Sequence, residues 1–189
     1  MSYQRFNPVP RAKDGRQPQI SSGYGMRSTG MHSGSDIMYR RSQCGEVSLP
    51  TMSKCYEMPS GTPALAYADG QVTISKEIGT GGYTMIRHPD GWTSQYMHLA
   101  RRNYQVGDQV KGGKPIGIIG YGPEYRLNHK HFQLRDPNGN LVDPAPYLAT
   151  ATVMPYPRSL WLYAGLTVGL LGIGYALWAR RTGRPLLPA

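Results

Sequence analysis

An uncharged apolar stretch, LWLYAGLTVGLLGIGYALWA at residues 160–179, constrains the fold of this chain more than any other feature. A helix of about 20 apolar residues is long enough to cross the hydrocarbon core of a bilayer. Tryptophan and tyrosine lie near both ends of the stretch, as they do at membrane interfaces, and arginines follow it. As a buried core helix it would be unusually long and apolar on every side. We therefore expect a single transmembrane helix in a lipid bilayer, with a separate domain before it.

The chain before this stretch has the composition of a β domain. Gly (24), Pro (16) and Tyr (14) are abundant among 189 residues, and this length suggests one domain with appendages. Short segments bounded by turn residues predict strands, and the clearest are QVTISKEIG (71–79), YTMIRH (83–88), TSQYMHLA (93–100) and HKHFQLRD (129–136). We expect an extended arm at 1–20, a mostly β domain at 21–148, a linker at 149–159, the helix at 160–179 and a basic tail at 180–189.

The formal charge of +10 indicates attraction to a polyanion such as nucleic acid, acidic lipid headgroups or the bacterial cell wall. The part before the linker contains neither a prominent basic run nor a nucleic-acid-binding motif, so no nucleic acid partner is expected. The opening residues, MSYQRFNPVPRAKDG, lack the apolar region of a secretory signal peptide. Cys44 and Cys55 fit no zinc-finger spacing, and both a local disulfide and two free thiols are open interpretations.

Two histidine-containing stretches suggest a metal site. HSGSD places His32 four residues before Asp36, and the intervening Gly34 allows the backbone to turn tightly enough to aim both side chains inward. In HKHF, His129 and His131 occupy positions i and i+2 of a strand, so they point to the same face. Three protein ligands with a fourth position for water define a catalytic zinc site. The natural set is the first histidine, the aspartate and one of the paired histidines.

The chain resembles the LytM/lysostaphin-type zinc endopeptidases, which cleave peptidoglycan peptides. Their first motif, H-x-G-x-D, is present as HSGSD, and their last, H-x-H followed by an aromatic residue, is present as HKHF. Three stretches between the motifs also resemble the family in order and spacing, namely GTPALAYADGQV, GGYTMIRHPDGWTSQYMHL and VGDQVKGGKPIGIIG. The similarity extends over about residues 21–148 and implies an antiparallel-sheet LytM-like peptidase domain.

The resemblance implies a role for each matching residue. His32, Asp36 and His131 correspond to the ligands of Zn²⁺, whereas His98 and His129 correspond to two catalytic histidines beside the metal. Zinc makes hydroxide available near neutral pH and polarises the scissile carbonyl. The two catalytic histidines would orient the nucleophile, transfer protons or stabilise the oxyanion, and which of them does which stays open.

Residues around the site carry three further expectations. Gln133 shares the histidine face of its strand and either supports the site or is an ordinary polar strand residue. His88, next to a turn, is expected to be a surface histidine outside the site. Residues 39–60 look like an insertion relative to compact family members, and bulky residues precede HKHF, which leaves the substrate specificity open.

We expect a membrane-anchored zinc endopeptidase that hydrolyses peptide cross-links of bacterial peptidoglycan. The alternative is a catalytically inactive LytM-like domain that serves as a structural or regulatory membrane protein. All three ligands and both catalytic histidines are present, which favours the enzyme. Arginines after the span predict an outward-facing domain, yet no export signal precedes it. An outward-facing domain without an export signal would be explained if this were a bacteriophage protein in the internal membrane of a virion, where it would aid wall penetration at genome entry. Otherwise we expect the protein in the bacterial inner membrane.

Overall fold

The structure, a computed structural model, describes residues 4–44, 52–122 and 127–157. Residues 1–156 form one compact unit, and only its described residues are discussed below. The predicted transmembrane helix at 160–179 and the basic tail at 180–189 lie outside the described residues. Within the described ranges, no helix is long and apolar enough to cross a membrane.

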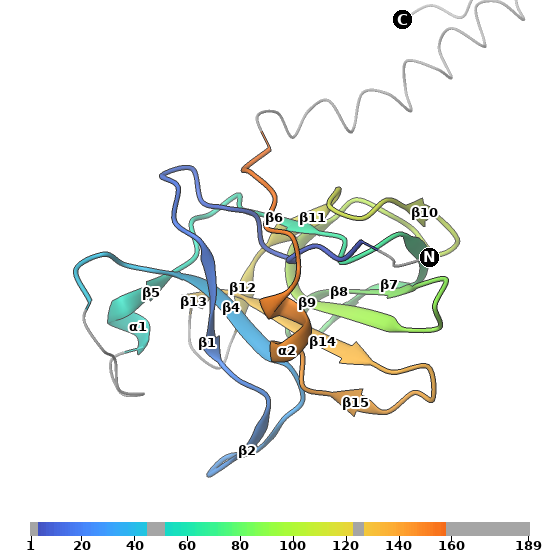
Figure 1. Cartoon of the computed structure of the whole chain (residues 1–189), viewed down its shortest axis with the longest axis horizontal. Helices are drawn as coiled ribbons and strands as arrows, with labels where there is room; N and C mark the ends of the chain where they lie inside the picture. Colours follow the sequence, from blue (N-terminus) through green and yellow to red (C-terminus); the bar gives the residue numbers. More distant parts are fainter. Residues whose placement is uncertain (1–3, 45–51, 123–126, 158–189) are drawn as a thin grey trace, which may run out of the picture. The chain divides into compact units, whose positions relative to one another are not determined.

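The unit is built on a large antiparallel sheet, which confirms the predicted mostly β, antiparallel class (Figure 1). The main path through the sheet runs β1 (Pro18–Ser22), β4 (Ser35–Arg40), β14 (Lys130–Arg135), β9 (Thr93–Arg102), β8 (Gly81–Arg87), β7 (Gly70–Ile78), β10 (Gln109–Val110). Short strands extend it, namely β5 (Tyr56–Glu57) on β4, β15 (Leu141–Val142) on β14, and β11 (Pro115–Ile119) between β9 and β6 (Pro63–Leu65). The described chain is completed by two small hairpins, β2 (Gly25–Arg27) with β3 (Gly30–His32) and β12 (Tyr121–Gly122) with β13 (Leu127–Asn128), and two short helices, α1 (Met52–Cys55) and α2 (Ala145–Ala149).

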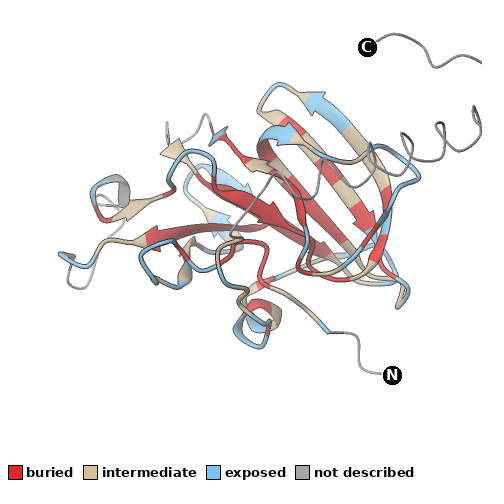
Figure 2. Cartoon of the chain, turned by 90° about the horizontal axis from the view of Figure 1, so that it is seen from above, coloured by how far each residue is buried: buried red, intermediate tan, exposed pale blue. Residues whose placement is uncertain are grey.

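The period of two in the central strands separates a core face from a functional face. In β14, Lys130, Phe132 and Leu134 have no exposed surface, and Phe132 packs against Tyr96 of β9 with ring centroids 5.4 Å apart. His131 points to the opposite face of the same strand. Figure 2 shows buried residues running along the strands in the middle of the sheet, with exposed residues gathered in turns and edges. Packing of Phe132 and Leu134 in the core therefore determines that His131, between them in the strand, points to the opposite face of the sheet.

The N-terminal arm is packed into the domain. Its backbone alternates hydrogen bonds with the segment that follows α2, since Asn7 N–H donates to Thr152 O (2.9 Å) and Thr152 N–H donates to Arg5 O (2.8 Å). Farther along, Arg11 N–H donates to Met154 O at 2.7 Å. Thr152 and Met154, which belong to the predicted linker, are thus hydrogen-bonded to the arm, and the compact unit continues to Tyr156.

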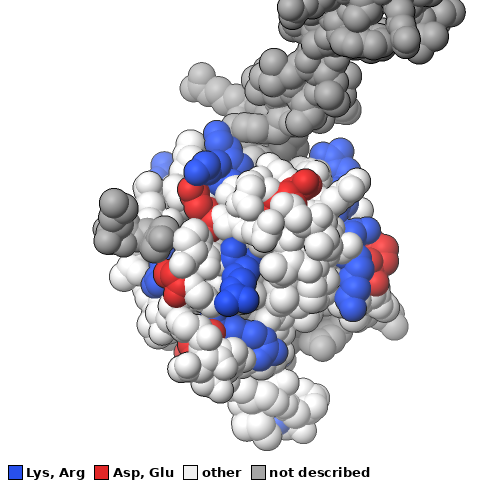
Figure 3. Space-filling view, turned by 90° about the vertical axis from the view of Figure 1, so that its right-hand side faces the viewer, with Lys and Arg blue, Asp and Glu red and all other residues white. Residues whose placement is uncertain are grey.

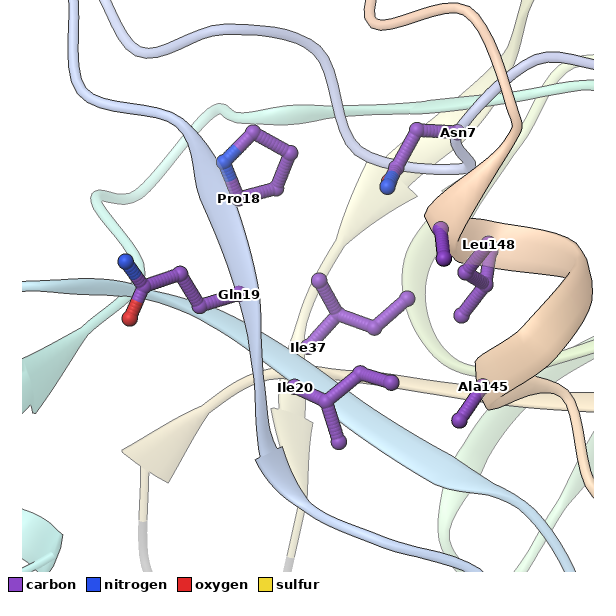
Figure 4. Close-up of a pocket in the computed structure, with 8 residues that line it drawn as sticks. Asn7, Pro18, Gln19, Ile20, Ile37, Ala145 and Leu148 are labelled. Carbon is purple, nitrogen blue, oxygen red and sulfur yellow. The ribbon is translucent and has the colours of Figure 1, made fainter.

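Two further features lie away from the histidine face. Cys44 and Cys55 form a disulfide with Cα atoms 5.6 Å apart, which resolves the two interpretations in favour of the local crosslink. It joins the chain after β4 to the end of α1, within the expected insertion. A small pocket lies between β1, β4 and α2, and Figure 4 shows its largely apolar lining. It contains no histidine, cysteine or charged residue, so it offers no acid–base or metal chemistry.

Candidate metal centre

Gly34 places the first motif against β14. A Cβ at this position would lie 2.4 Å from Phe132 O, 2.8 Å from Gln133 Cγ and 2.9 Å from His131 Nε2. The glycine is required because another backbone approaches it closely, and its φ lies outside the left-handed region. Gly34 was expected to be needed for a tight backbone turn; the structure shows instead that it is needed because there is no room for a side chain. This contact brings the chain around the glycine onto the strand that carries His131, and Asp36 pairs directly with that histidine between β4 and β14.

The three predicted ligands converge at this point. The structure brings one ligand atom each from His32, Asp36 and His131 within 4.8 Å of one another, and all three side chains are buried. His32 Nε2 lies 3.1 Å from His131 Nδ1 and 3.3 Å from Asp36 Oδ1. His131 Nδ1 lies 2.8 Å from the same carboxylate oxygen. Zinc–nitrogen bonds of about 2.0–2.1 Å in a tetrahedron separate neighbouring ligands by about 3.3 Å, so the spacing fits zinc.

The chemistry of the donors also fits a cation. Asp36 Oδ2 is buried and has no hydrogen-bond partner among the described residues, an arrangement that a bound cation would satisfy. Burial alone would raise the pKa of Asp36, but in the metal-free protein hydrogen bonds from protonated His131 and His32 outweigh it and hold the pKa well below its usual value. His32 Nδ1–H donates to Gly23 O at 2.6 Å, because a carbonyl can only accept. When His32 loses its other proton, that bond leaves the lone pair on Nε2, the nitrogen that faces Asp36 and His131 and would bind a cation.

The second nitrogen of His131 has a partner suited to metal binding through Nδ1. The Gln133 amide lies 3.1 Å from His131 Nε2 and 2.6 Å from Ser33 Oγ. A histidine that binds metal through Nδ1 carries its proton on Nε2, and the amide oxygen of Gln133 can accept that proton after rotation of the amide. Gln133 therefore contacts a predicted ligand directly, and ordinary strand polarity does not describe it.

His98 and His129 form a pair beside the three ligands, with ring centroids 4.7 Å apart. Each directs Nδ1–H at a backbone carbonyl, Thr80 O at 2.9 Å for His98 and Leu127 O at 3.1 Å for His129. In both rings Nε2 then carries the lone pair, and His129 Nε2 lies 3.6 Å from Asp36 Oδ1. Burial lowers the pKa of His98 to about 4, and burial also lowers the pKa of His129. Both are neutral near pH 7, the form that a proton acceptor needs.

The backbone around this pair is specialised. His98 has a φ of 57°, and it is the only non-glycine residue in the left-handed region among the residues that the structure describes. Such a conformation costs about 1–3 kcal/mol and is retained where neighbours enforce it. Gly120 N–H donates to His98 O at 2.6 Å, and a Cβ at Gly122 would lie 2.0 Å from His129 Cε1. These contacts orient the two rings toward the cluster.

His88, by contrast, is 5% exposed, so the expectation of a surface histidine was wrong. Its Nδ1 bonds Asp69 O and its Nε2 bonds Ser94 Oγ, each at 2.8 Å, and neither bond involves the metal cluster. Arg27 was not expected at the site, yet its guanidinium contacts Ser22 and His32 and lies 3.9 Å from Asp36 Oδ2. Only the folding of the β2–β3 hairpin shows this contact, since no local motif marks the arginine.

Comparison with known proteins places this arrangement in a family. Residues 53–144 match the model of peptidase family M23. The chain carries a peptidase M23 domain. Over 90 residues the chain is 38% identical to the DD-carboxypeptidase/endopeptidase Mpg of Neisseria meningitidis, covering 47% of this chain and 20% of that protein. The matched residues include His98, His129 and His131, whereas His32 and Asp36 lie before them and are joined to the site by the geometry above.

Solved structures agree. The M23 domain superposes on the catalytic domain of lysostaphin from Staphylococcus simulans with a TM-score of 0.52 and 27% identity, covering 72% of this chain and 95% of that one. A zinc-containing peptidase from Vibrio cholerae gives a TM-score of 0.55 and 25% identity, covering 75% and 39%. The chain spans between 13% and 28% of the length of the curated relatives that it matches, so the similarity is that of one domain.

Proposed function

We propose that this chain is a zinc-dependent endopeptidase that hydrolyses peptide cross-links of bacterial peptidoglycan. The observation that carries the proposal is the convergence of His32, Asp36 and His131 with two neutral histidines in one buried cluster. The homologues support the same reaction class, since one is a DD-carboxypeptidase/endopeptidase and another is a peptidoglycan DD-endopeptidase of Vibrio cholerae.

The side chains have separate tasks in this proposal. His32 through Nε2, His131 through Nδ1 and Asp36 through a carboxylate oxygen would hold Zn²⁺. Zinc, when bound, supplies acidification of a water molecule and polarisation of the scissile carbonyl. His98 and His129 accept or return protons at Nε2, because their Nδ1–H groups are fixed on backbone carbonyls. The Thr80 and Leu127 carbonyls hold the Nδ1 proton of each ring, so Nε2 is the nitrogen that gains and loses the transferred proton.

The test is metal analysis joined to a digestion assay. The full chain should bind one zinc and release muropeptides from isolated peptidoglycan, identified by mass spectrometry. His98→Ala and His129→Ala should keep zinc and lose activity by about 10²- to 10⁴-fold, the usual contribution of general acid–base groups. Zinc binding without any hydrolysis by the parent chain would favour the alternative, a catalytically inactive LytM-like domain with a structural or regulatory role.

The membrane anchor is a separate proposal that stands on residues 160–179 and their composition alone. A chain with this stretch should partition with lipid vesicles, and a chain without it should remain in the aqueous phase. A bacteriophage virion protein acting at genome entry stays a hypothesis; recovery of the native protein only from bacterial membranes would contradict it. The positive charge could assist at the anionic wall, although Figure 3 shows Lys and Arg in several separate groups on one face, some beside acidic residues.

A further inference from the structure

The face that carries His131 continues across three strands, away from the metal centre. Directly opposed residues on antiparallel strands point to the same face, so the register of β14, β9 and β8 assigns its members. We call these residues the floor, and they form three rows: His131–Met97, Gln133–Gln95–Met85, and Arg135–Thr93–Arg87. The rows follow one another at a spacing of two residues along each strand.

Two of the three residues in the middle row are glutamines, and both amides are held in place. Gln95 and Gln133 are each 4% exposed, and Tyr83 on β8 donates its hydroxyl to Gln95 Oε1 at 2.9 Å. The Gln133 amide is likewise held, by Ser33 Oγ at 2.6 Å. The middle row thus forms a fixed, nearly closed layer between the metal centre and the last row, and Arg87 is the exposed end of the floor.

The last row is cationic. Arg87 of β8 and Arg135 of β14 each pair directly with Thr93 of β9, so they lie on either side of it. Two strand spacings separate their Cα atoms by about 10 Å. Arg135 Nη1 donates to Gly139 O at 2.7 Å, which fixes one edge of its guanidinium. None of the ion pairs among the described residues involves either arginine, and none of the floor residues in the three rows is acidic.

We propose that Arg87, Thr93 and Arg135 form a subsite for a carboxylate of the substrate peptide. The proposal rests on the proposed function and narrows its substrate class to wall peptides with a free carboxylate on one side of the scissile amide. Guanidinium groups bind carboxylates in bidentate geometry, and the threonine hydroxyl adds a donor between them. From His131 to Arg135 is four residues, or about 13 Å of strand, which an extended peptide covers in about four residues.

The experiment uses the zinc-loaded full chain and two non-cleavable peptides in which a methylene-amine replaces the scissile amide. The peptides are identical except that the carboxylate about four residues from that bond is free in one and amidated in the other. The free-acid peptide should bind about three- to tenfold more tightly, as expected for a partly exposed pair of charge-assisted contacts, and added salt should reduce the difference. Arg87→Gln and Arg135→Gln should each reduce the preference and leave affinity for the amidated peptide unchanged.

Arg101→Gln is the matched control, because Arg101 is exposed at the opposite end of β9 and pairs with Ile118 of β11. It should keep the full preference. Equal affinity of the parent chain for the two peptides would overturn the subsite, as would an equal loss of preference in the control. The cleavable versions of the same peptides test the proposed function separately. A chain that prefers the free acid but hydrolyses neither peptide refutes the peptidase and retains the subsite.

Discussion

Gly34→Ala should disable the metal centre although Gly34 supplies no ligand. The added Cβ would lie 2.4 Å from Phe132 O, whereas real Cβ atoms essentially never come closer than 3.0 Å, so the two backbones must separate by at least 0.6 Å (3.0 − 2.4). Metal sites tolerate ligand displacements of about ±0.2 Å. The separation moves His131 relative to the other two ligands by more than this tolerance. Overpacking of this kind also lowers the free energy of unfolding by about 1–3 kcal/mol.

We therefore expect zinc affinity to fall by at least about 10- to 100-fold, the loss typical when residues that only orient metal ligands are changed. Competition with a chromogenic chelator measures the affinity, and circular dichroism shows whether the sheet is retained. Gly79→Ala is the control, because nothing lies within 4 Å of its added Cβ and its φ is not in the left-handed region. Parental zinc affinity in Gly34→Ala would refute the argument that close backbone approach positions the site.

Three other changes test the remaining parts of the site and domain. Asp36→Ala removes the carboxylate that contacts both ligand histidines and should leave zinc content well below one per chain by metal analysis. Burial lowers the pKa of His32 but the Asp36 hydrogen bond outweighs it, so the pKa is raised in the metal-free protein. Protons therefore compete with zinc as the pH falls through that pKa, and chelator titrations should show affinity dropping about tenfold per pH unit. A chain ending at Tyr156 should fold and bind zinc. A shorter chain that lacks Thr152 and Met154 loses the backbone hydrogen bonds to the N-terminal arm and should have a lower melting temperature than the chain ending at Tyr156.

Local pattern was enough to predict the faces of the central strands. The alternation in HKHFQLRD assigned His131 to one side and Phe132 to the other, and the structure confirms both. The spacing H-x-G-x-D likewise predicted that the side chains of Asp36 and His32 are aimed at one place, and the structure brings them within 3.3 Å of each other. These geometric predictions could be made because strand period and short motif spacing are properties of neighbouring residues, which the sequence displays directly.

Partners from distant segments were not predictable in the same way. The carbonyls that fix the tautomers of His32 and His98 belong to Gly23 and Thr80, and no side-chain pattern marks a backbone acceptor. His88 was misjudged for a related reason, since its turn suggested the surface, whereas the Asp69 carbonyl just before β7 and Ser94 of β9 supply hydrogen-bond partners for a buried ring. Burial of a polar side chain depends on whether the completed fold supplies partners, and the partners appear only with the sheet.

Lys130 shows how far a strand pattern reaches and where it stops. The alternation places it opposite the two flanking histidines, and it is fully buried there, an unusual position for a lysine. Its Nζ bonds Met97 O and lies 5.5 Å from the centre of the Tyr96 ring. Met97 immediately precedes His98, the residue with positive φ, so the Lys130 side chain ties β14, which begins directly after His129, to the strained backbone at His98. The alternation predicts which face Lys130 points to, but its hydrogen bond to Met97 O depends on the pairing of β14 with β9, which the sequence pattern does not reveal.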